Sequence, residues 1–146
     1  MAERRLQGLV LKVGPLGEHD RLLSLLSDSE GVTRLAVPGA RRPKSSLAAA
    51  APLTLLELQV GGRSGLARVR QLRVHRSFSR LGRRLETLAA AQALCELCLQ
   101  LAADDPIDGL LATVLLHLER LEHNAEDRCL VLASTVQAVV HLLTLG

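Results

Sequence analysis

The hydrophobic periodicity of this chain changes once, near Phe78, and that change limits the folds the chain can adopt. Before Phe78, short apolar runs are separated by Gly, Pro and acidic residues, as in strands joined by tight turns. After it, apolar residues recur every three or four positions, which is the spacing of amphipathic helices. We therefore predict an α+β chain with a strand-rich first part and an all-helical second part.

The strand-rich part contains five short candidate strands and one unusual connection. The strands are predicted over residues 4–13, 19–26, 33–37, 53–60 and 66–74. Residues 40–51 combine a basic loop with an Ala run that is long enough for a helical turn or two. Five strands with a small helical insert after the third are typical of an OB-type β-barrel. We accordingly assign residues 1–78 to an OB-fold domain and residues 79–146 to a helical domain.

The helical part divides into three amphipathic segments that we expect to pack as a bundle on the barrel. The first ends at Asp104, and its apolar positions are Leu81, Leu85, Leu88, Ala89, Leu94, Cys95, Leu97 and Leu101. Pro106 suits the first turn of the second helix, with Asp105 as its N-cap. The third starts near Glu126, and its predicted apolar face contains Leu130, Ala133, Val136, Val140 and Leu143.

Charge is distributed very unevenly between the two parts. The whole chain of 146 residues carries a net charge of +3. Residues 1–84 hold sixteen Lys and Arg against six acids, a balance of +10, whereas residues 85–146 hold two against nine, a balance of −7. Such asymmetry predicts a polyanionic partner for the first part and a different partner for the second.

Arg41, Arg42 and Lys44 form the densest group of cations, in the loop after the third predicted strand. One interpretation is that they contact phosphates, with Gly39 allowing close approach of the backbone. The other is that they only keep an exposed loop soluble. A loop of this composition is expected to stay unburied and to offer its cations to a partner.

A second group of cations follows the fourth predicted strand. Arg68 and Arg70 share one face of the fifth strand, Arg73 falls on the other unless a bulge intervenes, and Arg63 lies in the preceding turn. We predict that Arg63, Arg68 and Arg70 bind a phosphate backbone. The alternative is that arginines on an edge strand discourage sheet-to-sheet aggregation.

Aromatic residues are almost absent, with Phe78 the single example. OB-type proteins commonly stack bases of single strands on aromatic side chains. Binding here is therefore expected to rest on phosphate contacts, to depend strongly on salt, and to accept both single and double strands.

No pattern in the chain predicts catalysis or a bound metal. Cys95 and Cys98 form a CxxC pair, but the pair lies within an apolar helix and lacks further ligands, so both are predicted to be core residues. His19-Asp20 resembles a phosphohydrolase metal dyad without the other ligands that such a site needs. We expect no cofactor and no enzyme activity.

Cellular location is predicted from what the sequence lacks. The N-terminus has charges but no following apolar region of a secretory signal, and no apolar run reaches the roughly 18 residues of a membrane span. Three cysteines without framework spacing favour a reducing compartment. We expect a cytoplasmic protein, associated with the nucleoid, without a membrane partner.

Several motifs, in their order and spacing, resemble the RecO family of bacterial recombination mediators. They are GEHDRLLSLL, the turn at Glu30-Gly31, PGARRPKSS, PLTLLELQV, RSGLARVRQ and LETLAAAQALCELCLQL, which together cover nearly the whole chain. The resemblance implies a DNA repair protein without bond-making catalysis that binds single- and double-stranded DNA, anneals strands and helps to load a recombinase. Within the first motif it implies that Gly17 and Asp20 shape a turn and that Arg21 adds charge for DNA.

The resemblance also implies protein partners, namely RecR, in some cases RecF, and the acidic tail of the single-strand-binding protein. RecO proteins usually continue with more helices beyond the position of Gly146, and many carry a four-cysteine zinc-binding segment there. This chain is therefore expected to be a short member with part of its last helix unpaired. The alternative is a protein-binding adaptor, or an inactive relic, whose arginines serve only solubility.

Overall fold

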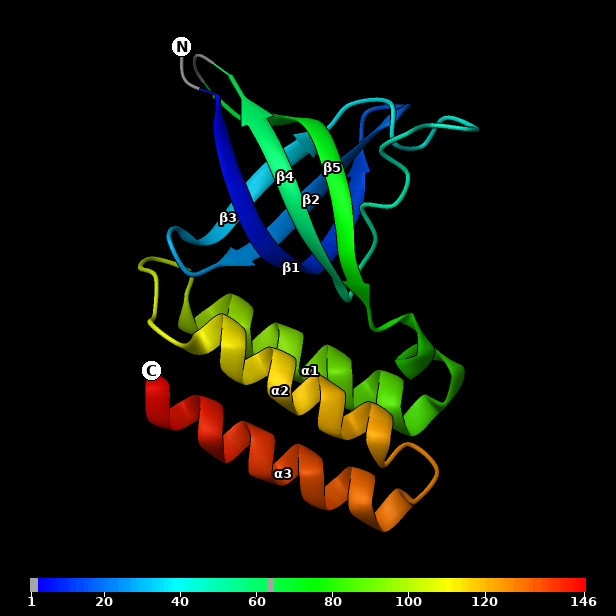
Figure 1. Cartoon of the computed structure of the whole chain (residues 1–146), viewed down its shortest axis with the longest axis vertical. Helices are drawn as coiled ribbons and strands as arrows, with labels where there is room; N and C mark the ends of the chain where they lie inside the picture. Colours follow the sequence, from blue (N-terminus) through cyan, green and yellow to red (C-terminus); the bar gives the residue numbers. More distant parts are fainter. Residues whose placement is uncertain (1–2, 63–64) are drawn as a thin grey trace.

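The structure is a computed structural model that describes residues 3–62 and 65–146. Five strands close into a barrel in the order β1-β2-β3-β5-β4 (Figure 1). Their bounds are β1 (Arg4–Leu16), β2 (Asp20–Ser27), β3 (Gly31–Val37), β4 (Thr54–Gly61) and β5 (Ala67–Ser77). Neighbouring strands are antiparallel except β3 and β5, which run parallel. The predicted five-stranded barrel is confirmed.

Leucine and valine side chains fill the barrel, although leucine is a weak strand former. Inward-facing residues alternate with outward-facing ones, most regularly along β4, because successive side chains of a strand point to opposite faces. The interior cluster consists of Leu6, Val10, Leu23, Leu25, Leu35, Val37, Ala40, Ala50, Leu56, Leu58, Val60 and Val69. Burial of this apolar set, rather than intrinsic strand propensity, stabilises the barrel.

The connection between β3 and β4 differs from the prediction in two ways. Residues 40–51 form successive turns, and the described residues include no helix there. The loop is also anchored, because Ala40 and Ala50 are 2% and 0% exposed and belong to the barrel core. Lys44 and Leu53 have φ values of 60° and 61°, a left-handed conformation that interrupts helical geometry. Ala40 and Ala50 thus pack into the barrel core while the cations between them stay exposed.

Three α-helices follow a short 3-10 helix, η1 (Ser79–Arg83). They are α1 (Leu85–Leu101), α2 (Leu110–His123) and α3 (Arg128–Leu145). In Figure 1, α1 and α2 lie directly beneath the barrel and α3 lies beyond them. Leu9 and Leu26 of the barrel pack in the same core cluster as residues from all three helices. The barrel and the helices therefore share one core. The proposed division into two domains at residue 78 stays a prediction.

The turn between β2 and β3 rests against the end of α1, and this contact requires a glycine. The backbone N–H of Val32 donates to the carbonyl oxygen of Ala102 over 3.0 Å. Gly31 has a φ of +69°, and a Cβ placed there would lie 2.8 Å from the same oxygen. A side chain at this position would therefore meet both an unfavourable φ and a clash.

The predicted start of the second helix was wrong. α2 begins at Leu110 with Gly109, at a φ of 81°, as its N-cap, so Asp105 and Pro106 precede the helix. The backbone of Asp105 and Pro106 runs 3.2 Å from the position that a Cβ on Gly31 would take. The chain crosses the β2–β3 turn at this point and can begin a helix only after passing it.

The predicted inner faces of two helices also need correction. On α3 the buried residues are Val131, Ser134, Ala138 and Leu142, whereas the predicted stripe is exposed, as at Val136 (56%) and Val140 (57%). Leu85 of α1 is 78% exposed as well. Apolar residues surround α3, so periodicity cannot select its inner face, and packing against α1 and α2 decides it. The expectation of an unpaired apolar face on this helix agrees with these exposures.

α3 also bears on the expected absence of a membrane-spanning stretch. Its 18 residues have a mean hydropathy of 1.6, which is long and apolar enough to cross a membrane by length and composition alone. The expectation that no stretch reaches this length was therefore wrong. In the structure, one side of α3 packs against α1 and α2, and 22% of its residues are buried.

Candidate nucleic-acid interface

The basic loop is tied to the turn between β1 and β2. Asp20 accepts a hydrogen bond from the Gly39 N–H over 2.7 Å, and the Arg41 N–H donates to the His19 carbonyl over 2.8 Å. The Arg41 guanidinium donates to the Gly17 carbonyl over 2.8 Å. These bonds hold the root of the loop and give Asp20 the shaping role that was expected. His19 lies in this turn rather than in a strand.

Two of the predicted DNA-binding arginines also serve the loop itself. Arg21 donates to the carbonyl of Ala48 over 3.2 Å, and Arg41 bonds to Gly17 as described. A guanidinium has five N–H donors, so each arginine keeps most of them for another partner. Arg42 and Lys44 are exposed and form no side-chain hydrogen bond or ion pair within residues 3–62 and 65–146. The loop therefore presents two uncommitted cations, Arg42 and Lys44, while Arg41 and the neighbouring Arg21 of β2 also hold it in place.

A bulge in β5 rearranges the second group of cations. The register pairs Val60 with Val69 and Gln59 with Gln71, so Arg70 is the extra residue. The bulge returns Arg73 to the outer face that carries Arg68, which is the exception that the sequence left open. Arg63 lies outside the described residues.

The edge-strand explanation does not hold for Arg68, and for Arg70 and Arg73 it stays an alternative. β5 pairs with β4 along most of its length, whereas its pairing with β3 covers Ala67 and Arg68. At these two residues the barrel closes and leaves no unpaired edge for a charged residue to protect. The parallel pairing also sets Arg68 opposite Ala36, close to the point where the basic loop leaves β3. The structure thus brings Arg68 and the loop to neighbouring strands.

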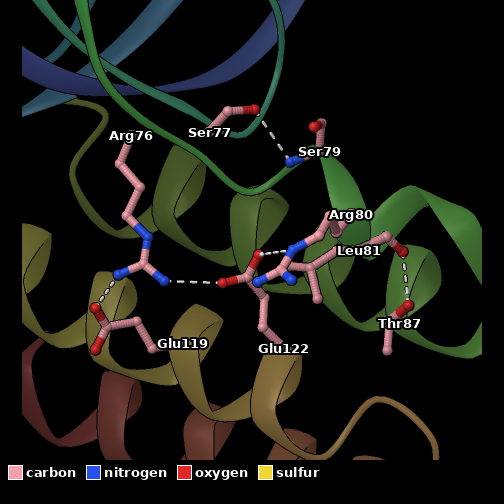
Figure 2. Close-up of polar contacts among 8 residues, drawn as sticks. All are labelled: Arg76, Ser77, Ser79, Arg80, Leu81, Thr87, Glu119 and Glu122. Carbon is pink, nitrogen blue, oxygen red and sulfur yellow. Dashed lines mark hydrogen bonds and ion pairs between the residues drawn. The ribbon is translucent and has the colours of Figure 1, made fainter.

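Several arginines near the junction of the barrel and the helices form ion pairs within the protein, and no local sequence pattern indicates these pairs. Figure 2 shows the Arg76 guanidinium between Glu119 and Glu122 of α2, with Arg80 on the other side of Glu122. Arg76 donates to Glu119 and, over 2.8 Å, to Glu122, while Arg80 lies 3.6 Å from Glu122. Arg84 approaches Glu126 at 3.7 Å. We call this group of ion pairs the barrel–helix clasp, in which Arg76 comes from β5 of the barrel and Arg80 and Arg84 come from the segment that joins it to α1.

The environment of Arg76 strengthens its ion pairs in the barrel–helix clasp. The Arg76 guanidinium lies 4.4 Å from the ring centroid of Phe78, which is 1% exposed. Partial burial lowers the pKa of Arg76, but hydrogen bonds to Glu122 and Glu119 outweigh this and raise it. The partners are 43 and 46 residues apart in sequence, so no local spacing could reveal them. Part of the charge asymmetry therefore joins the two parts of the chain.

Cys95 and Cys98 lie in the core, as predicted from the sequence. Cys95 and Cys98 are 4% and 0% exposed, and burial raises the pKa of each thiol to about 12. A thiol with such a pKa stays protonated at neutral pH and is a poor metal ligand. Among the described residues, no group of three or more His, Cys, Asp or Glu side chains is arranged to hold a metal ion.

Comparison with known proteins agrees with the resemblance seen in the sequence motifs. Residues 1–78 match the family model for the N-terminal part of recombination protein O. The chain is 81% identical over 146 residues to the DNA repair protein RecO of Synechococcus sp. (strain CC9605), covering 100% of this chain and 57% of that protein. It is 38% identical over 138 residues to RecO of Cyanothece sp. (strain PCC 7425 / ATCC 29141), covering 93% and 46%.

The chain spans about half the length of these curated relatives. The match to the family model includes all five strands of the barrel and ends at Phe78, and the close relatives align across the helices as well. Fold, motifs and identity point to the same conclusion, which is that the chain belongs to the RecO family.

Proposed function

We propose that this chain is the DNA-binding part of a recombination mediator that binds single and double strands and promotes their annealing. The observation that carries the proposal is the acid-free loop that exposes Arg42 and Lys44 without partners in the described part of the chain. Three further cations lie near the loop. Arg21 and Arg41 anchor it through hydrogen bonds, and Arg68 lies on β5, next to β3. Phosphate contacts from such cations need no particular base sequence.

The proposed mechanism is electrostatic and involves no bond making. Two strands repel each other through their phosphates, and a protein that neutralises both lowers this repulsion. No cofactor is required for such screening. The names of the relatives support a role in DNA repair, and we propose RecR, and in some cases RecF, as partners in recombinase loading. Arg63 and Arg70 are proposed as further phosphate contacts, in a cytoplasmic, nucleoid-associated protein.

A contact with the acidic tail of the single-strand-binding protein is also part of the proposal. The acidic helices themselves offer Arg120 and Arg128, of which Arg120 is hydrogen-bonded to Gln137 and Arg128 is paired with Glu86. The rival proposal, a protein-binding adaptor, is favoured by the exposed apolar face of α3. The barrel–helix clasp also supports this rival, because it uses several arginines internally.

The deciding experiment is the anisotropy of a labelled single-stranded oligonucleotide titrated with protein across a salt series. Changing Arg42 and Lys44 together to Gln removes two cations that the fold does not use. We expect the slope of log K against log salt to become shallower by about 1.4, at about 0.7 for each lost phosphate contact on a single strand.

A double change of Arg120 and Arg128 to Gln provides a matched control, since it removes the same charge from the helices. This control is expected to keep the wild-type slope. Changing Arg41, Arg42 and Lys44 to Glu is expected to abolish most binding. If the wild type binds weakly even at low salt, and neither loop variant changes that binding, the DNA proposal is wrong and the adaptor becomes the better account.

A further inference from the structure

The outer face of β1, β4 and β5 carries an ordered set of long polar side chains away from the basic loop. The register places Arg5 beside Gln59 and Gln59 beside Gln71. One step along, it places Gln7 beside Glu57 and Glu57 beside Arg73. We call this set, Arg5, Gln7, Glu57, Gln59, Gln71 and Arg73, the polar grid.

The polar grid is accessible. Arg5, Gln7, Gln71 and Arg73 are exposed, and Glu57 and Gln59 are half-buried. A shallow hollow of about 210 Å³ on this face is lined by Arg5, Glu57, Leu58, Gln59, Gln71, Leu72 and Arg73. In Figure 1, β4 and β5 cross in front of β2 and β3, while the loop after β3 projects to one side and the helices lie below.

Charge on the polar grid favours an anionic ligand. Its one carboxylate, Glu57, lies 3.0 Å from His75 and 3.4 Å from Arg73. The hydrogen bond from His75 and the charges of Arg73 and Arg5 outweigh desolvation and hold the pKa of Glu57 below its usual value. Arg5 forms no ion pair of its own among the residues that the structure describes. With Glu57 ionised and paired, Arg5 and Arg73 leave a net positive surface.

We propose that the polar grid binds the phosphate backbone of a second nucleic-acid strand, while the basic loop binds the first. Neighbouring strands are about 4.8 Å apart and each residue advances about 3.4 Å, so Arg5 and Arg73 flank β4 diagonally at a separation of roughly 12 Å, which leaves room for one extended backbone between them. Glutamine amides donate hydrogen bonds to phosphate oxygens without adding charge. The face has no aromatic residue to stack bases.

This proposal rests on the proposed function and deepens it, because annealing requires two strands on one protein. Covering by the helices does not explain the polar grid, because its residues remain exposed or half-buried with all three helices in place. Two separated cationic surfaces allow two strands to be held without competing for the same residues.

The test measures how many DNA strands one protein molecule binds. Protein is titrated, well above the dissociation constant, with two non-complementary oligonucleotides that carry a donor and an acceptor dye, and stoichiometry is measured by analytical ultracentrifugation. The wild type is expected to bind two strands and to give energy transfer. Changing Arg5 and Arg73 to Gln is expected to leave one strand bound and to remove energy transfer. In a separate assay with complementary oligonucleotides, the same change is expected to slow annealing by about tenfold or more. Changing Arg42 and Lys44 to Gln is expected to have the same effect through the other surface.

The outcomes separate the two proposals. The wild type could bind one strand, and the change in the loop could be the one that removes it. That result refutes binding by the polar grid and leaves the proposal of DNA binding by the loop intact. A grid variant that still binds two strands refutes the polar grid as well. A wild type that binds no strand refutes both. Unchanged melting temperatures of the variants establish that lost binding does not reflect unfolding, and the Arg120 and Arg128 double change serves again as the control.

Discussion

Arg76 offers the sharpest test of how the barrel and helices are held together. Its guanidinium reaches Glu119 and Glu122 of α2 and lies over Phe78 (Figure 2). The Glu122 side chain is only 7% exposed, so it depends on its arginine partners more than the half-exposed Glu119 does. Changing Arg76 to Met keeps an unbranched chain over Phe78 and removes the charge and both hydrogen bonds.

The expected loss of stability follows from these exposures. The exposed pair with Glu119 contributes less than about 1 kcal/mol. A hydrogen bond to the nearly buried Glu122 carboxylate contributes about 1.5 kcal/mol, because its loss leaves a charge poorly solvated. Arg80 still lies 3.6 Å from Glu122 and offsets part of that loss. We expect about 2 kcal/mol in total, or a melting temperature lower by about 4–8 °C for a chain of this size.

Urea and thermal unfolding followed by circular dichroism measure this difference. Arg83 of η1 provides the matched control, since it is exposed and forms no ion pair in the described part of the chain. Changing Arg83 to Met is expected to cost less than about 0.5 kcal/mol. A double-mutant cycle of Arg76 with Glu122→Gln should give a coupling energy of about 1 kcal/mol. A coupling energy near zero, or an Arg76 variant as stable as the Arg83 variant, refutes the argument.

Three further predictions concern stability and association. Burial, together with His141 and Arg120, holds the pKa of His117 below its usual value, so the unfolded chain binds a proton that the folded chain does not. Stability should therefore fall as pH drops below about 6.5, and His117→Gln should reduce the difference between urea midpoints at about pH 7.5 and about pH 5.5. Gly31→Ala should lower the free energy of unfolding by more than about 2 kcal/mol. Gly17→Ala is the control, because Gly17 has a similar φ of +64° but no atom within 4 Å of the added Cβ, and it should cost about 1 kcal/mol. Equal losses of stability in urea unfolding would contradict the clash with Ala102. Changing Val136 and Val140 to Lys should leave the helical circular dichroism intact and reduce self-association in light scattering, because both side chains are more than half exposed.

Local sequence patterns were sufficient for the parts of the fold that depend on neighbouring residues. Turn residues mark both ends of β3 closely, since Gly31 is its first residue and Pro38-Gly39 directly follows its last. The positions of Cys95 and Cys98 in a regular apolar repeat identified them as core residues. Local patterns did not predict the conformation of segments whose own residues allow more than one conformation. The Ala run beside Lys44 has good helix formers, yet Ala40 and Ala50 are buried in the barrel core and the segment between them, with Lys44 at a positive φ, forms turns.

The sequence by itself determined the strand-to-helix order, the barrel class and the basic loop, because hydrophobic period, turn residues and charge are properties of short segments. Only the tertiary structure decided which face of α3 is buried, that Arg73 joins Arg68 on one face, and that Arg76 pairs with α2. Each of these depends on residues far apart in sequence that meet only after the chain has folded. The separation of cations into internal ion pairs and accessible surfaces is therefore a property of the fold, and it is on that separation that the proposed DNA-binding surfaces rest.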